Sequence, residues 1–255
     1  MWTREELKSR AVDVLQACRW PAVAVCLVMT AVSGGVSGAG GRSSGTSHSG
    51  GSNVADASIS DLLKGFDAKI LIAILAVAGA MILLSIAVSV FVKNPLEVGS
   101  KKFFITARQD MTGNVGEILY GFKNSYLRNV GGLVLRQIFI SLWSLLLIIP
   151  GIIKSYEYCM VSYLLADFPE MTVKEAFEYS KRMTAGQKWD IFVLDLSFIP
   201  WMLLGAITCG IVYIFHVGPY VEFTKAELYA ALKDELASND AEFASLVKKD
   251  EVVYN

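Results

Sequence analysis

The sequence has few of the residues on which enzymes and metalloproteins most often depend. Its 255 residues include two histidines and four cysteines. Only 18% are charged, whereas about a quarter is usual for soluble domains. The net charge of −1 provides no basic field for nucleic acid, so we expect no nucleic-acid partner. No two cysteines have CxxC spacing, which indicates neither a zinc site nor a disulfide framework. We interpret them as unreactive thiols: Cys18, Cys26, Cys159 and Cys209.

Motifs of catalysis are also missing. No nucleophile–base pair, metal-ligand spacing or phosphate-binding loop is recognisable, so we expect neither enzyme activity nor a cofactor. Residues 33–53 are rich in glycine and serine. A phosphate loop needs a strand before it and a helix after it, and neither pattern flanks this segment. We expect a flexible loop in which His48 has no partners for a metal site.

Apolar residues, in contrast, are abundant. They make up 54% of the chain, and the mean hydropathy is +0.47. The central apolar run, Leu133–Phe168, is broken once by Pro150 and Gly151. A helix rises about 1.5 Å per residue and a bilayer core is about 30 Å thick. Each arm is therefore either a short membrane span or a long buried helix, and the composition favours the membrane.

The apolar runs predict an all-α, polytopic helical membrane protein. We expect one membrane domain over residues 1–232 and a charged cytoplasmic tail over 233–255. The clearest span is Ile70–Val92, twenty-three residues without a charge. An alternative with four spans and re-entrant hairpins stays open. The six predicted spans are about 20–36, 69–92, 133–149, 151–166, 189–207 and 209–224.

Two hairpins late in the chain resemble each other. Trp143-x-Leu145-Leu146 leads to Pro150-Gly151, and Trp201-x-Leu203-Leu204 leads to Gly210. These prolines and glycines are the predicted hairpin breaks. Each hairpin follows a basic amphipathic segment, so with the N-terminal region the chain reads as three units of surface helix plus hairpin. Internal repeats are common in transporters, but tandem duplication also builds bundles that transport nothing.

Three segments begin with capping signals, in which the first residue and a carboxylate three residues later satisfy free N–H groups of the first turn. After the second signal, Pro95 suits the first helical position. The first segment leads into an apolar run that we interpret as a span, with a signal peptide as the rival interpretation. The pairs are Thr3 with Glu6, Asn94 with Glu97, and Thr172 with Glu175.

Lysine and arginine are distributed unevenly. With six spans, eighteen of the 23 lie on one side, which predicts that this side and both termini face the cytoplasm. Basic residues near aromatic ones are then expected to contact lipid headgroups. The predicted headgroup contacts are Lys101, Lys102, Arg108, Lys174, Lys181 and Arg182.

A few charges fall within apolar runs, where each costs at least about 2.5–3.5 kcal/mol. We predict that Arg136 and Asp195 form an ion pair, because both lie four or five residues into spans that start on the cytoplasmic side. The other candidates are Lys154, Glu157, Asp190, His216 and Glu222, for which the alternative is pairing or snorkelling within a turn of the interface. Asp190 and Glu222 lie near span ends, where this alternative is favoured, and His216 is interpreted as a hydrogen-bonded histidine at the interface.

Several ordered strings carry a family resemblance. They include Asn94-Pro95-Leu96-Glu97-Val98-Gly99, Ile149-Pro150-Gly151-Ile152-Ile153-Lys154, Leu165-Ala166-Asp167-x-Pro169, Leu196-Ser197-Phe198-Ile199-x-Trp201 and Thr224-x-Ala226-x-x-Tyr229. The chain resembles the bacterial integral-membrane family named domain of unknown function 975. It is also distantly similar to the membrane domain of some glycerophosphodiester phosphodiesterases, but it lacks the catalytic barrel. Pro200 stands where this pattern has glycine. The resemblance implies a protein of the bacterial cytoplasmic membrane without an assigned activity.

Two functional hypotheses follow. The first is a non-catalytic membrane protein that binds lipids or another membrane protein. The second is a small transporter that uses the repeated hairpins and the intramembrane charges. A transporter needs charges along a path between the leaflets, whereas most charges here lie near the ends of the apolar runs. The sequence therefore favours the first hypothesis.

Overall fold

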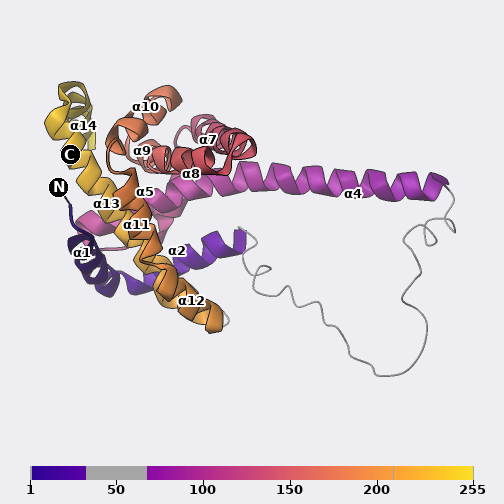
Figure 1. Cartoon of the computed structure of the whole chain (residues 1–255), viewed down its shortest axis with the longest axis horizontal. Coiled ribbons are helices and arrows are strands. Elements are labelled where there is room, and N and C mark those ends of the chain that lie inside the picture. The colour runs from indigo at the N-terminus through magenta and orange to yellow at the C-terminus, as the bar shows by residue number, and fades with distance from the viewer. Residues whose placement is uncertain (1, 33–67, 209, 255) are drawn as a thin grey trace.

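The computed structural model describes residues 2–32, 68–208 and 210–254, which are helical and contain no strand (Figure 1). The predicted loop 33–53 lies outside these residues. The α-helices are α1 (Arg4–Ala17), α2 (Arg19–Val32), α4 (Ala68–Val88), α5 (Asn94–Asp110), α6 (Tyr120–Lys123), α7 (Tyr126–Leu146), α8 (Ile148–Glu157), α9 (Val161–Asp167), α10 (Val173–Met183), α11 (Lys188–Leu196), α12 (Ile199–Ile207), α13 (Gly218–Asn239) and α14 (Ala241–Tyr254). Shorter elements are the π-helices η1 (Ser89–Lys93) and η3 (Tyr213–Val217) and the 3₁₀-helix η2 (Val115–Leu119).

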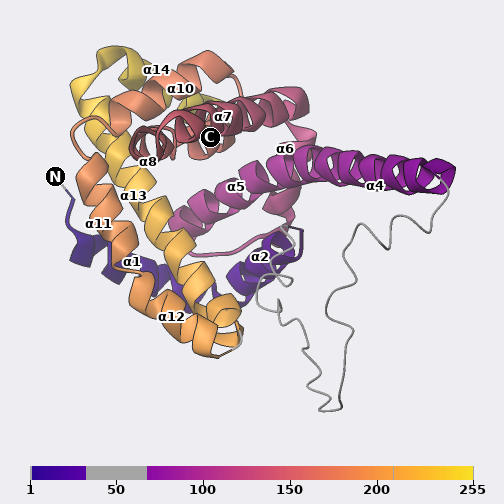
Figure 2. The same ribbon diagram turned by 45° about the vertical axis from the view of Figure 1, so that its right-hand side comes forward.

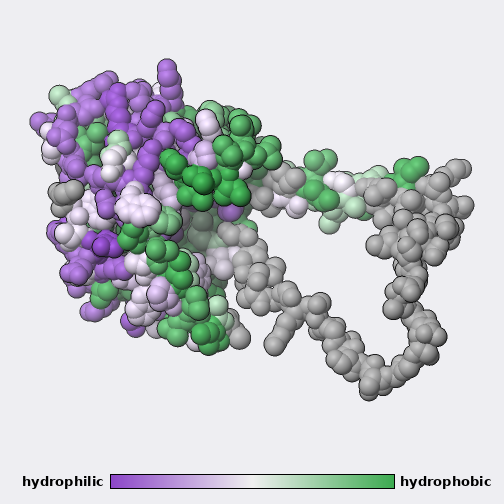
Figure 3. Space-filling view, in the orientation of Figure 1, coloured by the Kyte–Doolittle hydropathy of each residue, from purple (hydrophilic) through white to green (hydrophobic). Residues whose placement is uncertain are grey.

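The fold has a packed body from which apolar helix ends project. In the turned view of Figure 2, α13 runs through the body, and it contacts α1, α2, α5 and α10. The α7–α8 hairpin, the end of α12, α2 and the long α4 extend outward (Figure 1). Figure 3 shows hydrophilic residues over the body and hydrophobic residues on the projecting ends. The molecule is therefore polarised between a charged body and apolar extensions.

Aromatic side chains hold the centre of the body together. Phe104 of α5 packs edge-on against Phe103 at 5.1 Å and against Phe223 of α13 at 5.0 Å, measured between ring centroids. All three rings are fully buried. Every residue of α9 is buried as well. The core thus lies where α5, α9 and α13 meet.

Fewer helices can cross a membrane than the six predicted. Three stretches are long and apolar enough: Ala76–Asp110, Tyr126–Leu146 and Lys188–Ile207. A fourth is present if α1 and α2, bent by 99°, count as one span. The prediction of six spans was wrong because the returning arms of the two late hairpins, predicted as spans 151–166 and 209–224, are not among these stretches. The ten residues of α8 rise only about 15 Å and α9 is enclosed by protein, while η3 leads directly into buried residues of α13.

The expected restart of a helix at Asn94 is also corrected. The backbone runs from α4 through η1 into α5 without leaving helical geometry, and Lys93, at the cap position, makes no side-chain capping bond. Pro95 has no N–H for the carbonyl four residues before it, that of Phe91. The Tyr126 hydroxyl donates to this carbonyl at 2.9 Å instead. The break in the pattern thus marks a π-turn rather than a new N-terminus.

The other two predicted capping signals are present in the structure, one fully and one in part. Thr172 and Glu175 form the full capping box at the start of α10, as predicted. The Thr3 hydroxyl accepts a hydrogen bond from the Glu6 backbone N–H at 3.3 Å. The Glu6 carboxylate, however, pairs with Arg10 at 2.6 Å. Only half of the first box is therefore present.

The first hairpin turns earlier than the sequence predicted. The break lies at Leu147, whose backbone is extended, and Pro150 falls in the first turn of α8, where it is tolerated. Gly151 has a different role, because a Cβ there would lie 2.3 Å from Ser144 Oγ of α7. It lets the two arms approach closely. In the second hairpin Gly210 has φ of +85°, which agrees with the predicted break.

The two hairpins share a structural feature beyond their sequences. Lys154 of α8 places its Nζ 5.7 Å from the ring of Trp143 on α7. His216 of η3 lies 6.3 Å from Trp201 on α12, between ring centroids. In each hairpin a tryptophan on the outgoing arm thus faces a basic side chain on the returning arm.

The C-terminal segment packs against the body. Helix α13 continues to Asn239, past the predicted start of the tail, and α14 follows. Phe243 of α14 is fully buried, with its ring 4.9 Å from that of Tyr179 and 5.8 Å from that of Phe168. Residues of the predicted tail therefore contribute to the core.

Candidate functional site

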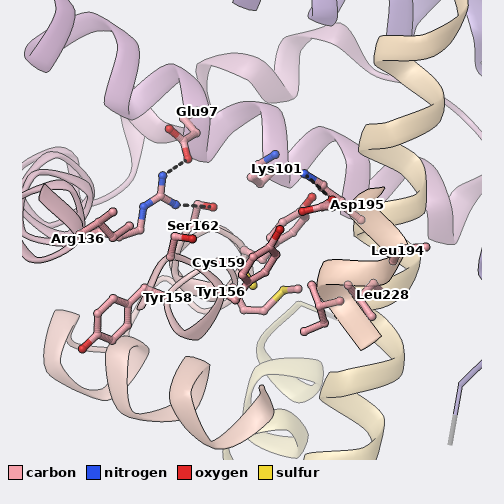
Figure 4. A pocket seen from close by; sticks show the side chains of 16 residues that line it. Glu97, Lys101, Arg136, Tyr156, Tyr158, Cys159, Ser162, Leu194, Asp195 and Leu228 are labelled. Atoms are coloured by element: carbon pink, nitrogen blue, oxygen red, sulfur yellow. Dashed lines mark hydrogen bonds and ion pairs between the residues drawn. The ribbon is translucent and has the colours of Figure 1, made fainter. Parts of the chain in front are cut away.

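A cavity of about 270 Å³ lies where α5, α7, α8, α9, α11 and α13 converge (Figure 4). Helices α5 and α7 contribute Glu97, Lys101 and Arg136, while α11 and α13 contribute Asp195 and Lys225. The remaining wall is mostly apolar or aromatic. The cavity thus collects charged side chains from parts of the chain more than a hundred residues apart.

Arg136 joins three helices. Its guanidinium donates to Glu97 Oε1 at 2.9 Å through Nη2 and to Ser162 Oγ at 3.3 Å through Nη1 (Figure 4). The Arg136 and Glu97 side chains are 19% and 18% exposed. An arginine that bonds through two nitrogens is held in one orientation. This pair therefore sets how α7 lies against α5 and α9.

Lys101 forms the second pair, with Glu222 of α13 at 2.5 Å. Its Nζ also lies 4.9 Å from the centroid of the Tyr163 ring. Burial alone would raise the pKa of Glu222, but Lys101 and Lys225 outweigh burial and lower it. Glu222 therefore carries its negative charge at neutral pH.

Asp195 forms the third and longest pair, 3.4 Å from Lys225 Nζ. Both side chains are about one-third exposed, at 33% and 36%. Burial, followed by the neighbouring carboxylate of Asp195, raises the pKa of Tyr156 to about 12. The Tyr156 phenol is therefore a hydrogen-bonding group at this end of the cavity and not an ionised base.

The predicted direct pair of Arg136 with Asp195 is corrected by this arrangement. Both side chains line the same cavity, as the repeat suggested, but each has another partner. The reason is that α5 and α13 enter the bundle. They bring Glu97 and Lys225 nearer than the two predicted partners come to each other.

The other charges from the apolar runs have separate environments. Glu157 is buried between Lys154 and Lys188, each at 2.8 Å, and these two ammonium groups outweigh its burial and lower its pKa. Asp190 is exposed at the start of α11. His216 is exposed and stacks on Tyr220 with ring centroids 6.4 Å apart. These residues are not part of the cavity.

Two of the six predicted headgroup contacts are turned inward. Lys101 belongs to the cavity, and Arg108 pairs with the buried Glu227 of α13 at 2.8 Å. The sequence did not reveal these acidic partners because α13 was not expected to pack against α5. Lys102 lies 5.4 Å from the Tyr120 ring centroid. On α10, Lys174 and Lys181 are exposed, as is Arg182, which pairs with Glu178 and Asp240.

Sequence reasoning missed several residues of the site. The sequence pattern predicts a helix cap at Glu97, although Pro95 two residues earlier signals that the backbone there is unusual. The charge distribution predicts only a cytoplasmic location for Lys225. Tyr163 and Ser162 lie in an apolar run and carry no distinguishing pattern.

Part of the chain, including a portion of the cavity, matches a known protein family. Residues 145–235 match the family model described as protein of unknown function DUF975. The matched segment extends from the end of α7 into α13 and includes Asp195 and Lys225 of the cavity. No curated protein and no solved structure matches the chain. The distant similarity to glycerophosphodiester phosphodiesterase membrane domains stays a prediction. Over residues 145–235, the chain is therefore similar to the DUF975 family of proteins of unknown function.

Proposed function

We propose that this protein is a non-catalytic integral membrane protein that binds membrane lipids. The observation that carries the proposal is the tip of the α7–α8 hairpin. Five consecutive large apolar residues, 145–149, are 63 to 86% exposed there. Leaving one such side chain in water forgoes about 1.5–3 kcal/mol. A soluble protein rarely exposes an apolar patch of this kind, whereas the acyl chains of a bilayer cover it.

Helix α4 supports the same proposal. Its apolar side chains are exposed in several directions, with Ile72 at 66%, Val77 at 64% and Leu83 at 70%. The apolar window of the stretch that contains α4 has a mean hydropathy of 2.2 and no buried residue. A helix that is apolar on all sides is typical of a core or a membrane span, and the described residues of this chain do not enclose it.

The arrangement of the extensions favours one orientation. The start of α1 and the helix α14 lie on the body, while the apolar ends project away from it (Figure 1). We propose that the body faces the cytoplasm of a bacterial cell, with both termini inside, because eighteen of the 23 basic residues were assigned there. Cysteines introduced at Ser44 and Asn239 then label from opposite sides of the membrane. Labelling of both by an impermeant reagent outside intact cells contradicts this topology.

Bromine quenching of tryptophan fluorescence tests the insertion of the hairpins directly. The tips carry Trp143 and Trp201, which are 40% and 42% exposed. Variants that retain one tryptophan each are reconstituted in phosphatidylcholine bilayers with bromine deep in the acyl chains. We expect strong quenching of these two. The control is Trp2 on the body, whose indole N–H donates to Gln187 at 2.5 Å.

The outcome of this experiment is decisive for the proposal. Equal quenching of Trp2 and Trp143 shows that the hairpin does not enter the bilayer selectively.

The charged cavity favours the second hypothesis, a small transporter. However, residues 145–149 and 199–207 at the tips carry no charge. A proton flux in proteoliposomes that is lost in Asp195→Asn supports transport instead.

A further inference from the structure

The cavity has balanced charge. Its wall holds three cations and two carboxylates, and a third carboxylate, Glu222, neutralises Lys101 from the adjoining turn of α13. A ligand with a net charge would leave one charge without compensation in a partly desolvated site, which is costly. A zwitterion adds no net charge. The cavity therefore suits a ligand that carries one anionic and one cationic group.

Two residues that line the cavity carry polar atoms that indicate where the anionic end lies. The Nε of Arg136 and the hydroxyl of Tyr163 are buried without hydrogen-bond partners. Tyr163 is 2% exposed. Buried polar groups of folded proteins are nearly always paired, and both of these donate hydrogen bonds, so they fit anionic oxygens.

The part of the wall formed by α11 and α13 suits the cationic end. Asp195 is one-third exposed, and its contact with Lys225 is the longest of the cavity's ion pairs. A carboxylate accepts up to about four hydrogen bonds, so it can receive N–H groups from a ligand. A primary ammonium supplies three such donors, whereas a quaternary ammonium supplies none.

The volume of the cavity and its depth in the bilayer restrict the size and the type of ligand further. Liquid water occupies about 30 Å³ per molecule, so 270 Å³ suits a group of roughly nine non-hydrogen atoms. Arg136 lies ten residues before Leu146, about 15 Å along α7, and Asp195 lies about 18 Å from Ile207. Half of the hydrocarbon core is about 15 Å. Hairpin tips that reach the bilayer midplane thus place the cavity at the level of the headgroups.

We propose that the cavity binds a phosphate ester with a primary ammonium group, presented as the headgroup of phosphatidylethanolamine. The phosphate lies toward Arg136 and Tyr163, and the ammonium lies toward Asp195. The inference rests on the proposed lipid binding. The same chemistry is present in free phosphoethanolamine, which is the alternative source.

Native mass spectrometry of the detergent-purified full chain tests the inference. Phosphatidylethanolamine, phosphatidylcholine and phosphatidylglycerol with identical acyl chains are added together, and the bound populations are compared. We expect a preference of at least roughly tenfold for phosphatidylethanolamine over each of the other two, equivalent to about 1.4 kcal/mol. Asp195→Asn should abolish the preference. Asp190→Asn, the same change at an exposed position of the same helix, should retain it.

Further measurements in the same experiment distinguish failure of the headgroup inference from failure of the proposed membrane insertion. Equal binding of the three lipids by the wild-type protein overturns the inference, whether or not Asp195→Asn folds. Lys225→Gln is the second variant and should retain the preference, because it removes the cation that competes with the ammonium for Asp195. Binding of free phosphoethanolamine without a preference among the lipids overturns the headgroup as the source. Quenching of Trp143 in phosphatidylcholine bilayers does not depend on this headgroup, so failure of the proposed insertion is recognised independently.

Discussion

The pair of Glu97 and Arg136 offers the sharpest test of how the bundle is assembled. Unit charges 2.9 Å apart attract by about 6 kcal/mol at an effective dielectric constant of 20. Because nearly a fifth of each side chain is exposed, solvent screening and desolvation reduce this value. We expect a coupling energy of about 2–4 kcal/mol between Glu97→Gln and Arg136→Met.

A second double-mutant cycle serves as the control. Arg136→Met combined with Asp195→Asn should show a coupling of no more than about 0.5 kcal/mol, because these residues share the cavity without pairing. Both cycles are measured by unfolding the detergent-solubilised protein with sodium dodecyl sulfate and following tryptophan fluorescence. A larger coupling in the second cycle than in the first would refute the arrangement of α5 against α7.

Three further predictions concern packing, pH and thiol chemistry. Gly151→Ala should lower the melting temperature because its Cβ would meet Ser144, whereas Gly131→Ala, with open space around it, should raise the temperature through helix propensity; equal effects contradict the close crossing of α7 and α8. The lowered pKa of Glu157 means that its pairs stabilise the fold above the ordinary carboxyl pKa of 4.5 and that this contribution is lost as the pH falls below it. Thermal melts from pH 6 to pH 3 should therefore decline less in Glu157→Gln than in the wild type, and parallel curves argue against the pairs. Burial raises the pKa of the Cys159 thiol to about 12, so only about one thiol in ten thousand is ionised at pH 8. With the other cysteines replaced, alkylation should be slow until the protein is unfolded, and rapid labelling of the folded protein contradicts this environment.

The basic helix α10 shows which structural features can be predicted from neighbouring residues alone. Its capping box was predicted from Thr172 and Glu175 alone, because capping depends on groups three residues apart. The exposed positions of Lys174 and Lys181 also agree with a helix that turns one face to solvent. Whether these lysines contact lipid headgroups stays a prediction, because that contact depends on a membrane surface and not on the helix.

The helical class, the resemblance of residues 145–235 to DUF975 and the apolar character of the helices that extend from the body could all be predicted from the sequence. These properties are sums over neighbouring residues, so no knowledge of distant contacts is needed. It also located the turn at Gly210, whose positive φ is a local preference of glycine.

The number of apolar segments that are able to cross a membrane, and the partners of each charged residue, depend on how the helices pack against one another. Residues 151–166 were predicted as a span from their apolar side chains, but α9 is buried, and an apolar run alone does not distinguish lipid from protein interior. Likewise, Glu97 had two plausible partners, the free N–H groups of a helix start or a distant cation. The continuous helix through Pro95 removed the first and the approach of α7 supplied the second, because an ion pair is selected by the distance between elements and not by their order in the chain.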